Sequence, residues 1–408
     1  MSIRELTLDQ LGAVARGRSR HRPRDAEFLY GGPFPFIQTG DVKRANLYLT
    51  DYEQTYSEAG LAQSKLWPVG TLCITIAANI ADTAILGIDA CFPDSVIGFS
   101  ADTEKADTRF VKYLFDGVLK TKYRSFTQGA AQDNLSQEKL LSIRFPVPEI
   151  RVQQRIADIL SAYDDLIENN RRRITLLEEA ARMLYREWFV HFRFPGHEHV
   201  RIIDDIPEGW ERRPISDLAE VLRGKSYSSA ELVDQGGQPF VNLKCIERFG
   251  GFRISGLKGF KGEHKPHHLI GPGDIAIAVT DMTRDAMIVA QAARIPKTVG
   301  PHAIFSMDLV KVVPKEGFEP DWIYGLLRHS LFSNEVREEA TGATVLHLKP
   351  KYIESWKSVV PPHMLRSLFA TAVHDFLEQK DNLELQIVKL AQARDLLLPR
   401  LMNGEIAV

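Results

Sequence analysis

The chain has 408 residues, a length that predicts two or three domains rather than one. Hydrophobic residues make up 44% of the sequence and charged residues 25%, and no apolar run approaches the roughly 20 residues needed to cross a bilayer. The three cysteines are scattered and odd in number, which argues against a disulfide framework and against a cysteine zinc site. We therefore expect a cytoplasmic globular protein with no membrane partner and no bound metal.

The net charge of −2 argues mildly against nucleic-acid binding, because phosphate contacts require lysine and arginine. Five arginines nevertheless alternate between Arg16 and Arg24, around an Arg-Gly-basic-Ser turn. Further along, a glycine turn introduces a buried strand over 72–76, and the polar loop 78–82 leads to a second apolar strand. We expect residues 1–148 to form one α/β domain.

A long helix follows Pro148, within a helical region that we place at 149–191. Its apolar residues recur at alternating steps of four and three, which is typical of a heptad seam. The predicted seam consists of Ile156, Leu160, Tyr163, Ile167, Ile174, Leu177 and Leu184. Asn170 interrupts the seam, and a polar residue there can fix the register and the partner at a cost in stability. The alternative is an ordinary amphipathic helix that packs on a core of its own.

The second half of the chain repeats the first. A single offset of 213 aligns residues 129–188 with 342–401 without a gap. Proline, glycine and charged residues mark 192–205 as a linker, so we expect a second domain at 206–361 and a second helical region at 362–408. The second helix has its own predicted seam, made of Phe376, Leu383, Ile387, Leu390 and Leu397.

Polar residues interrupt this second seam as well, at Lys380 and Arg394. The globular segments repeat more loosely, because the strand at 72–76 matches 275–279 at an offset of 203. We therefore expect an α+β fold of two pseudo-repeated α/β domains, each followed by a long helix. The two helices are expected to pack as an antiparallel coiled coil with approximate two-fold symmetry.

Several sequence phrases resemble the specificity subunits of type I restriction–modification systems. They are Gly129–Ser136, Pro146-Val147-Pro148 leading to Gln153–Ala157, and Ile206–Trp210 at the start of the second half. The resemblance covers essentially the whole chain, and the order and duplication of the phrases are more specific than any one of them. The first half lacks the Pro-Glu-Gly-Trp opening, and the loop at 342–348 differs from its counterpart in the first half.

The resemblance implies a recognition subunit that carries no catalytic residue and binds no cofactor. Two target-recognition domains would each read one half of an asymmetric, bipartite site on double-stranded DNA, while the helices set the spacer. The subunit would recruit two adenine-N6 methyltransferase (M) subunits that carry S-adenosylmethionine. It would also join restriction (R) subunits, which translocate DNA and use ATP and magnesium.

Polar and basic residues in turns that recur in both halves are the candidates for DNA contact. Arginine and lysine form paired bonds to guanine, asparagine and glutamine do so to adenine, and a glycine lets the backbone approach a phosphate. The candidates in the first half are Arg16, Arg18, Arg20, Gln38, Asn79, Gln132 and Asn134. Those in the second half are Arg223, Lys225, Asn242, Lys244, Arg284, Thr344 and His347.

Other functions fit less well. An amino-methyltransferase would need an amide or carboxylate before its double proline and an aromatic residue after it, and Val360-Pro361-Pro362-His363 has neither. The histidines at 264, 267 and 268 lie in one short segment, which rarely supplies a complete metal shell, so we interpret them as a surface loop. The remaining alternative is a coiled-coil scaffold that joins two protein-binding domains without binding DNA.

Overall fold

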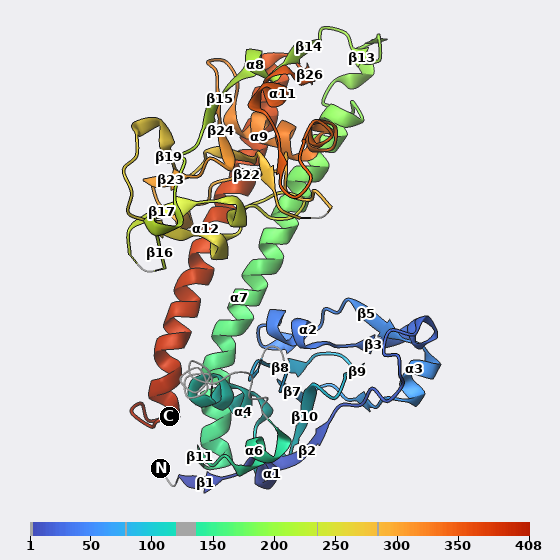
Figure 1. Ribbon diagram of the computed structural model, residues 1–408, viewed down its shortest axis with the longest axis vertical. Coiled ribbons are helices and arrows are strands. Elements are labelled where there is room, and N and C mark those ends of the chain that lie inside the picture. Colours follow the sequence, from blue (N-terminus) through green and yellow to red (C-terminus); the bar gives the residue numbers. More distant parts are fainter. Residues whose placement is uncertain (1–2, 78–79, 120–135, 235, 284) are drawn as a thin grey trace. The chain divides into compact units, whose positions relative to one another are not determined.

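The computed structural model describes residues 3–77, 80–119, 136–234, 236–283 and 285–408. The chain divides into two compact units. The first consists of Met1–Asn169 with Ile387–Val408, and the second of Asn170–Gln386. Each unit therefore combines one globular region with part of each of two long helices, and we describe the units separately (Figure 1).

Two sheets form the globular region of the first unit. The larger has the order β2 (Gly12–Arg16), β10 (Val96–Ala101), β7 (Leu72–Thr75), β8 (Thr83–Leu86), β4 (Tyr48–Leu49). The smaller has the order β5 (Gln54–Tyr56), β3 (Tyr30–Phe36), β9 (Ala90–Cys91), β6 (Leu66–Trp67). Its helices are α1 (Leu8–Leu11), α2 (Thr39–Arg44), α3 (Glu58–Ala62), α4 (Thr108–Leu114) and α6 (Gln137–Ser142). A separate pair, β1 (Arg4–Leu6) and β11 (Phe145–Val147), is antiparallel.

The second unit also contains two sheets. One has the order β15 (Ala219–Arg223), β24 (Leu309–Pro314), β20 (Ile275–Ala278), β22 (Ala292–Arg294). The other has the order β16 (Leu232–Val233), β18 (Lys258–Phe260), β17 (Gln238–Val241), β23 (Ala303–Phe305), β19 (Leu269–Ile270). Three strand pairs complete it: β14 (Glu211–Pro214) with β26 (Lys357–Val360), β21 (Thr280–Asp281) with β25 (Leu346–His347), and β12 (Ile202–Ile203) with β13 (Ile206–Pro207). Its helices are α8 (Ile215–Leu218), α9 (Pro320–His329), α10 (Phe332–Arg337) and α11 (Pro350–Ser355).

The two globular regions share one topology. In both, a central strand lies antiparallel between two others, as β2-β10-β7 in the first unit and β15-β24-β20 in the second. In both, the other sheet contains one parallel pair, β3 with β9 and β17 with β23. The strands expected at 72–76 and 275–279 are the buried strands β7 and β20. The predicted α+β fold class, with a repeated globular region followed by a long helix, is confirmed.

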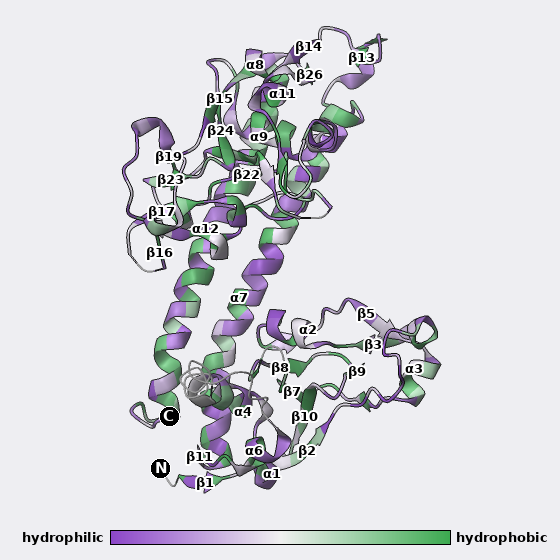
Figure 2. Ribbon diagram, in the orientation of Figure 1, coloured by the Kyte–Doolittle hydropathy of each residue, from purple (hydrophilic) through white to green (hydrophobic). Residues whose placement is uncertain are grey.

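The long helices are α7 (Ile150–Tyr185), which continues as a π-helical turn at Arg186–Val190, and α12 (His363–Met402). Both carry hydrophilic and hydrophobic residues along their length (Figure 2). Within the second unit Asn170 bonds to Gln386, and the ring of Tyr185 contacts that of Phe369 at 5.8 Å. Because the partner number falls as the α7 number rises, the helices run antiparallel there. The approximate two-fold symmetry stays a prediction.

All predicted seam residues of α7 and α12 are buried or partly buried. The three polar residues that interrupt the seams each have a partner. The amide nitrogen of Asn170 donates to Gln386 Oε1 at 3.2 Å, and Arg394 pairs with Asp164 of α7. Lys380 Nζ lies 3.2 Å from Glu178 and 3.2 Å from Glu384.

Helix α12 buries more than a two-helix seam. Leu377 and Asp381 are also buried, and Asp381 accepts a bond from Arg294 of β22 at 2.7 Å. A second face of α12 therefore packs on the globular region of its own unit. This face escaped the heptad analysis because a seam describes only one contact surface of a helix.

The segment expected as a linker, 192–205, contains a short helical turn and strand β12. Phe194 in this segment is only 6% exposed and packs against Trp210 at a ring distance of 5.2 Å. No helix among the described residues is both long and apolar enough to span a membrane.

Candidate nucleic-acid interface

The carboxyl ends of three strands meet at one turn of the first unit, Phe92–Ser95, which we call the first edge turn. Following β2, Arg18 donates its backbone N–H to the carbonyl of Phe92 at 3.0 Å. Following β7, Ile76 donates to the carbonyl of Ser95 at 3.0 Å. Strand β3 ends beside the same turn, because it runs parallel to β9, which leads into the turn. Side chains that follow these strands are therefore presented at one edge of the first unit.

The second unit repeats this arrangement at Phe305–Asp308, the second edge turn. Lys225, which follows β15, donates its backbone N–H to the carbonyl of Phe305 at 2.8 Å. Val279, which follows β20, donates to the carbonyl of Asp308 at 2.9 Å. Strand β17 runs parallel to β23 and so ends at the same place.

The structure brings most of the predicted DNA-contacting residues to these two edges. In the first unit, Arg16 ends β2, Arg18 and Arg20 follow it, and Gln38 follows β3. In the second, Arg223 and Lys225 end or follow β15, while Asn242 and Lys244 follow β17. His347 reaches the second edge through β25, where it pairs with Thr280. Thr344 is exposed in the loop before β25. Asn79, Gln132, Asn134 and Arg284 lie outside the described residues.

Two glycines allow the basic turns to lie against the edge turns. A Cβ added to Gly17 would lie 2.3 Å from the carbonyl oxygen of Phe92, and one added to Gly224 would lie 2.1 Å from that of Ser306. Real Cβ atoms do not approach so closely, so both positions need glycine. The sequence predicts that these glycines let the backbone approach a DNA phosphate. In the structure, the atoms that lie close to them are carbonyl oxygens of the protein backbone.

The basic turn of the first unit is held by its backbone and leaves two cationic side chains exposed. Ser64 donates its hydroxyl to the carbonyl of Arg18 at 2.8 Å, and Gln63 Oε1 accepts the backbone N–H groups of Arg20 and His21 at 2.5 and 3.0 Å. Within the described part of the chain, the guanidinium groups of Arg18 and Arg20 make no hydrogen bond or ion pair. They are therefore available to a polyanion.

The neighbouring arginines are already engaged. Arg16 donates from Nε and Nη2 to the carbonyl of Asp94, at 3.0 and 2.7 Å. Arg24 forms an ion pair with the carboxylate of Asp94 at 2.9 Å. Arg22 donates to the carbonyls of Ser19 and His21, at 2.7 and 2.8 Å. The alternating arginines thus divide into three that hold the loop and two that face solvent.

Sequence reasoning missed a second loop at each edge, the one that precedes β6 or β19. In the first unit this loop supplies Gln63 and Ser64, which hold the basic turn. In the second unit it is Glu263–His268, because β19 pairs antiparallel with β23 and so begins at the carboxyl end of that strand. The pKa of His268 is lowered, first by burial and then by neighbouring cations that include Lys225. The histidine cluster was the one feature of the sequence that could have indicated this loop at the second edge.

The amide candidates differ in what they leave free. Asn242 is 7% exposed; its Nδ2 donates to the carbonyl of Gly256 at 2.8 Å, and its Oδ1 accepts the backbone N–H of Lys244 at 2.9 Å. It therefore holds a turn and leaves Lys244 at the surface. Gln38 is exposed and donates its amide to Gln54 at 2.5 Å.

A buried carboxylate organises another loop of the second edge. Asp281 Oδ1 accepts the backbone N–H of Thr283 at 2.7 Å, and Oδ2 accepts those of Ile288 and Val289 at 2.6 and 2.9 Å. Burial alone would raise the pKa of Asp281, but these hydrogen bonds outweigh it and the pKa is lowered. A charged aspartate thus shapes the loop on which Arg284 was predicted to contact DNA.

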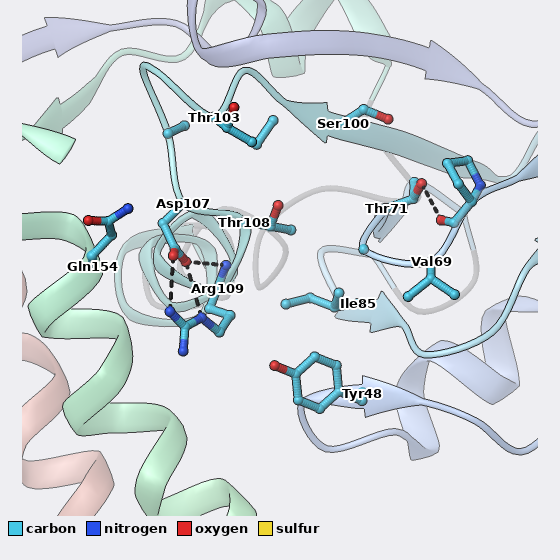
Figure 3. A pocket seen from close by; sticks show the side chains of 14 residues that line it. Tyr48, Val69, Thr71, Ile85, Ser100, Thr103, Asp107, Thr108, Arg109 and Gln154 are labelled. Atoms are coloured by element: carbon cyan, nitrogen blue, oxygen red, sulfur yellow. Dashed lines mark hydrogen bonds and ion pairs between the residues drawn. The ribbon is translucent and has the colours of Figure 1, made fainter. Parts of the chain in front are cut away.

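The first unit also contains an open pocket of about 470 Å³ (Figure 3). It lies where β7 begins and β10 ends, at the opposite end of the sheet from the edge turn. Arg109 in its wall pairs with Asp107 at 3.1 Å and with Asp158 at 2.9 Å. None of the predicted DNA-contacting residues that the structure describes lines the pocket, so it is separate from the candidate interface.

Comparisons with known proteins agree with this architecture. A family model described as "Type I restriction modification DNA specificity domain" matches residues 4–179. The chain is 27% identical to the type I restriction enzyme MjaIX specificity subunit of Methanocaldococcus jannaschii, over 98% of this chain and 93% of the relative. It is 20% identical to the HindI specificity subunit of Haemophilus influenzae, over 66% and 70%.

A solved S subunit of a type I restriction–modification system from M. genitalium has the same fold. It matches with a TM-score of 0.60 and covers 98% of this chain and 96% of that chain, at 14% identity. Over residues 4–179 the chain matches the type I restriction modification DNA specificity domain, and along almost its whole length it is similar to a type I restriction enzyme specificity subunit.

Proposed function

We propose that this chain is the sequence-specific DNA-binding subunit of a type I restriction–modification complex and has no catalytic activity of its own. The observation that carries the proposal is the repeated edge turn. Each unit gathers the same three strand ends at one place, yet presents different side chains there. Equal scaffolds with unequal side chains suit a reader of two different half-sites on double-stranded DNA, and hence of an asymmetric bipartite target.

The chemistry would then reside in partner subunits. We infer that this chain assembles with two M subunits and with R subunits, and the names of the relatives, which are subunits of restriction enzymes, support assembly with partner subunits in general. We infer that the M subunits supply S-adenosylmethionine for adenine-N6 methylation. The R subunits would use ATP and magnesium. The spacer between half-sites would be set by α7 and α12, whose paired polar seam residues hold one register.

A scaffold function without DNA binding is the second candidate, favoured by the net charge of −2. The scaffold and the DNA-binding subunit differ in the side chains that they require at the edge turns. A scaffold has no need for Arg18 and Arg20 to remain unpaired, because unpaired cations contribute nothing to the joining of two protein-binding domains. A DNA reader needs such cations for phosphate contact.

The test is to sequence the methylated adenines of a host that expresses this chain with its M subunit, and of a host that expresses the M subunit alone. We expect a new N6-methyladenine mark on a split, asymmetric motif that disappears without this chain. If the complex assembles and methylates other substrates but produces no such motif, the DNA-reading proposal is wrong and the scaffold takes its place.

A further inference from the structure

The loop Glu263–His268 brings a group of imidazoles to the second edge. The backbone N–H of Lys265 donates to His268 Nδ1 at 3.2 Å, so the neutral ring carries its proton on Nε2. The rings of His267 and His268 meet edge to face, with 4.2 Å between their centroids. The loop therefore presents two adjoining imidazoles next to the Arg-Gly-Lys-Ser turn.

The charges that face His268 are predominantly positive. They are those of His264, Lys265 and His267 on its own loop, and of Lys225 on the turn after β15. Glu231, before β16, faces Lys225 and accepts the backbone N–H of Ser228 at 2.6 Å. Glu263 is exposed on the same loop.

Other charged groups nearby have partners of their own. Lys311, behind the start of β19, donates to the carbonyl of Leu269 at 3.3 Å and pairs with Asp274 at 2.6 Å. Asp308 accepts the hydroxyl of Tyr227 at 3.3 Å. In contrast, no ion pair involves Lys225, Lys265 or the three histidines in the described parts of the chain.

The first edge uses cations of another kind. At the equivalent place the exposed side chains are Arg18 and Arg20, and Lys65 stacks over the ring of Trp67 with its Nζ 3.5 Å from the centroid. Arginine and lysine stay charged throughout the neutral range, whereas histidine changes charge within it. The first edge therefore carries Arg18, Arg20 and Lys65 with one histidine, His21, in its basic turn, whereas the second edge gathers three histidines beside lysines.

We propose that His264, His267 and His268 together with Lys225 form a binding site for the phosphate backbone of DNA, and that this site takes up a proton when DNA binds. The inference rests on the proposed function and adds a proton linkage at the second half-site. A phosphate placed between Lys225 and the imidazoles replaces repulsion among cations with attraction to an anion. The imidazolium form is favoured in the complex, and the lowered pKa of His268 in the free protein leaves room for that change.

The consequence is measurable as a pH dependence of affinity. Uptake of one proton changes the dissociation constant by up to tenfold for each pH unit, with tighter binding at lower pH. The full chain with its M subunit is titrated with a duplex that carries the methylated motif, between pH 5.5 and 8.0 at constant ionic strength. We expect the dissociation constant to rise with pH by about three- to tenfold per unit between pH 6 and 7.5.

Three variants isolate the source of the slope. The triple variant H264Q/H267Q/H268Q should bind with an affinity that is nearly independent of pH. The variant His268→Arg should also lose the slope but bind more tightly than the triple variant at pH 8, because it restores a permanent cation. His199→Gln changes an exposed histidine outside the loop and should keep the slope of the unaltered complex.

The outcomes separate the two proposals. Specific binding with a slope that persists in the triple variant overturns the proton-linked site and leaves the DNA-reading function intact. Specific binding with no slope in the unaltered complex does the same. Absence of motif-specific binding at every pH overturns both.

Discussion

The guanidinium group of Arg394 on α12 forms an ion pair with the carboxylate of Asp164 on α7, within the first unit. Asp164 is only 1% exposed and also accepts the hydroxyl of Tyr113 at 2.6 Å and the amide of Asn46 at 3.2 Å. Burial, and then the charge of Asp164, raises the pKa of Tyr113, so this phenol remains a donor. One carboxylate thus joins the two helices to the globular region.

Removal of this carboxylate should destabilise the first unit strongly. Asp164→Ala leaves a partly buried guanidinium, a phenol and an amide without their acceptor, and breaking such a pair from one side costs about 3–5 kcal/mol. Hydrogen–deuterium exchange of peptides from the first unit measures the loss as faster exchange. Asp165→Ala, one residue further along the same helix and exposed, is the matched control. Equal exchange in the two variants would contradict the role of Asp164.

The edge turn should tolerate no side chain at Gly17. Gly17→Ala forces a Cβ against two backbone carbonyls, each 2.3 Å away, and overpacking of this kind costs about 1–3 kcal/mol. Gly40 lies in α2 with no atom within 4 Å of an added Cβ, so Gly40→Ala should be neutral or stabilise by up to about 1 kcal/mol. Urea titration of both variants checks the difference. A loss at Gly40 as large as that at Gly17 would rule out steric contact as the cause.

The unpaired cations of the first edge should appear in the salt dependence of DNA binding. If Arg18 and Arg20 each contact a phosphate, the double Arg→Ala variant lowers the slope of log affinity against log salt by about 1.8. The control is Lys105→Ala, which removes an exposed cation after the far end of β10. Titrations of duplex DNA between 50 and 300 mM salt decide the matter, and an unchanged slope in the double variant would show that these side chains do not contact phosphate.

His329 in the second unit should make stability depend on pH. Burial, followed by the charges of Arg328 and Arg182, lowers its pKa to about 3. The ring is therefore neutral in the folded state, while in the unfolded chain it binds a proton below about pH 6.5. Stability should fall as the pH drops below about 6.5, by at most about 1.4 kcal/mol per unit, until the pH approaches 3.

His329→Gln should remove this contribution. Chemical denaturation between pH 7 and 4 gives the slope of the unfolding free energy, which we expect to be shallower in His329→Gln than in the unaltered chain. His199→Gln, at an exposed position, should leave the slope unchanged. If both variants have the same slope, another group is responsible for the pH dependence.

The parts of the fold that the sequence predicts are those determined by local periodicity. The helices α7 and α12 begin at Ile150 and His363, which are separated by the offset of 213 that aligns the two halves. A heptad pattern depends on one residue in three or four facing the same side, so the seam could be assigned without knowledge of any distant residue. The glycine turns before β7 and β20 likewise predict buried strands from local sequence alone.

The candidate interface is less local. Arg18 and Arg20 were predicted from their turn, but nothing nearby in the sequence indicates that Ser64 and Gln63 hold that turn. Likewise, Lys225 lies near the loop Glu263–His268, some forty residues further along the chain. Such meetings follow from strand order and register, which single-sequence patterns determine only weakly.

The strand pairs β1–β11 and β14–β26 have a consequence for how such chains change over time. Arg4 lies opposite Val147, and Glu211 lies opposite Val360, so each globular region begins and finishes at neighbouring points. A region whose two ends are adjacent can be exchanged as a cassette without displacing the helix that follows it. New sequence preferences could therefore arise by recombination between related genes, one half-site at a time.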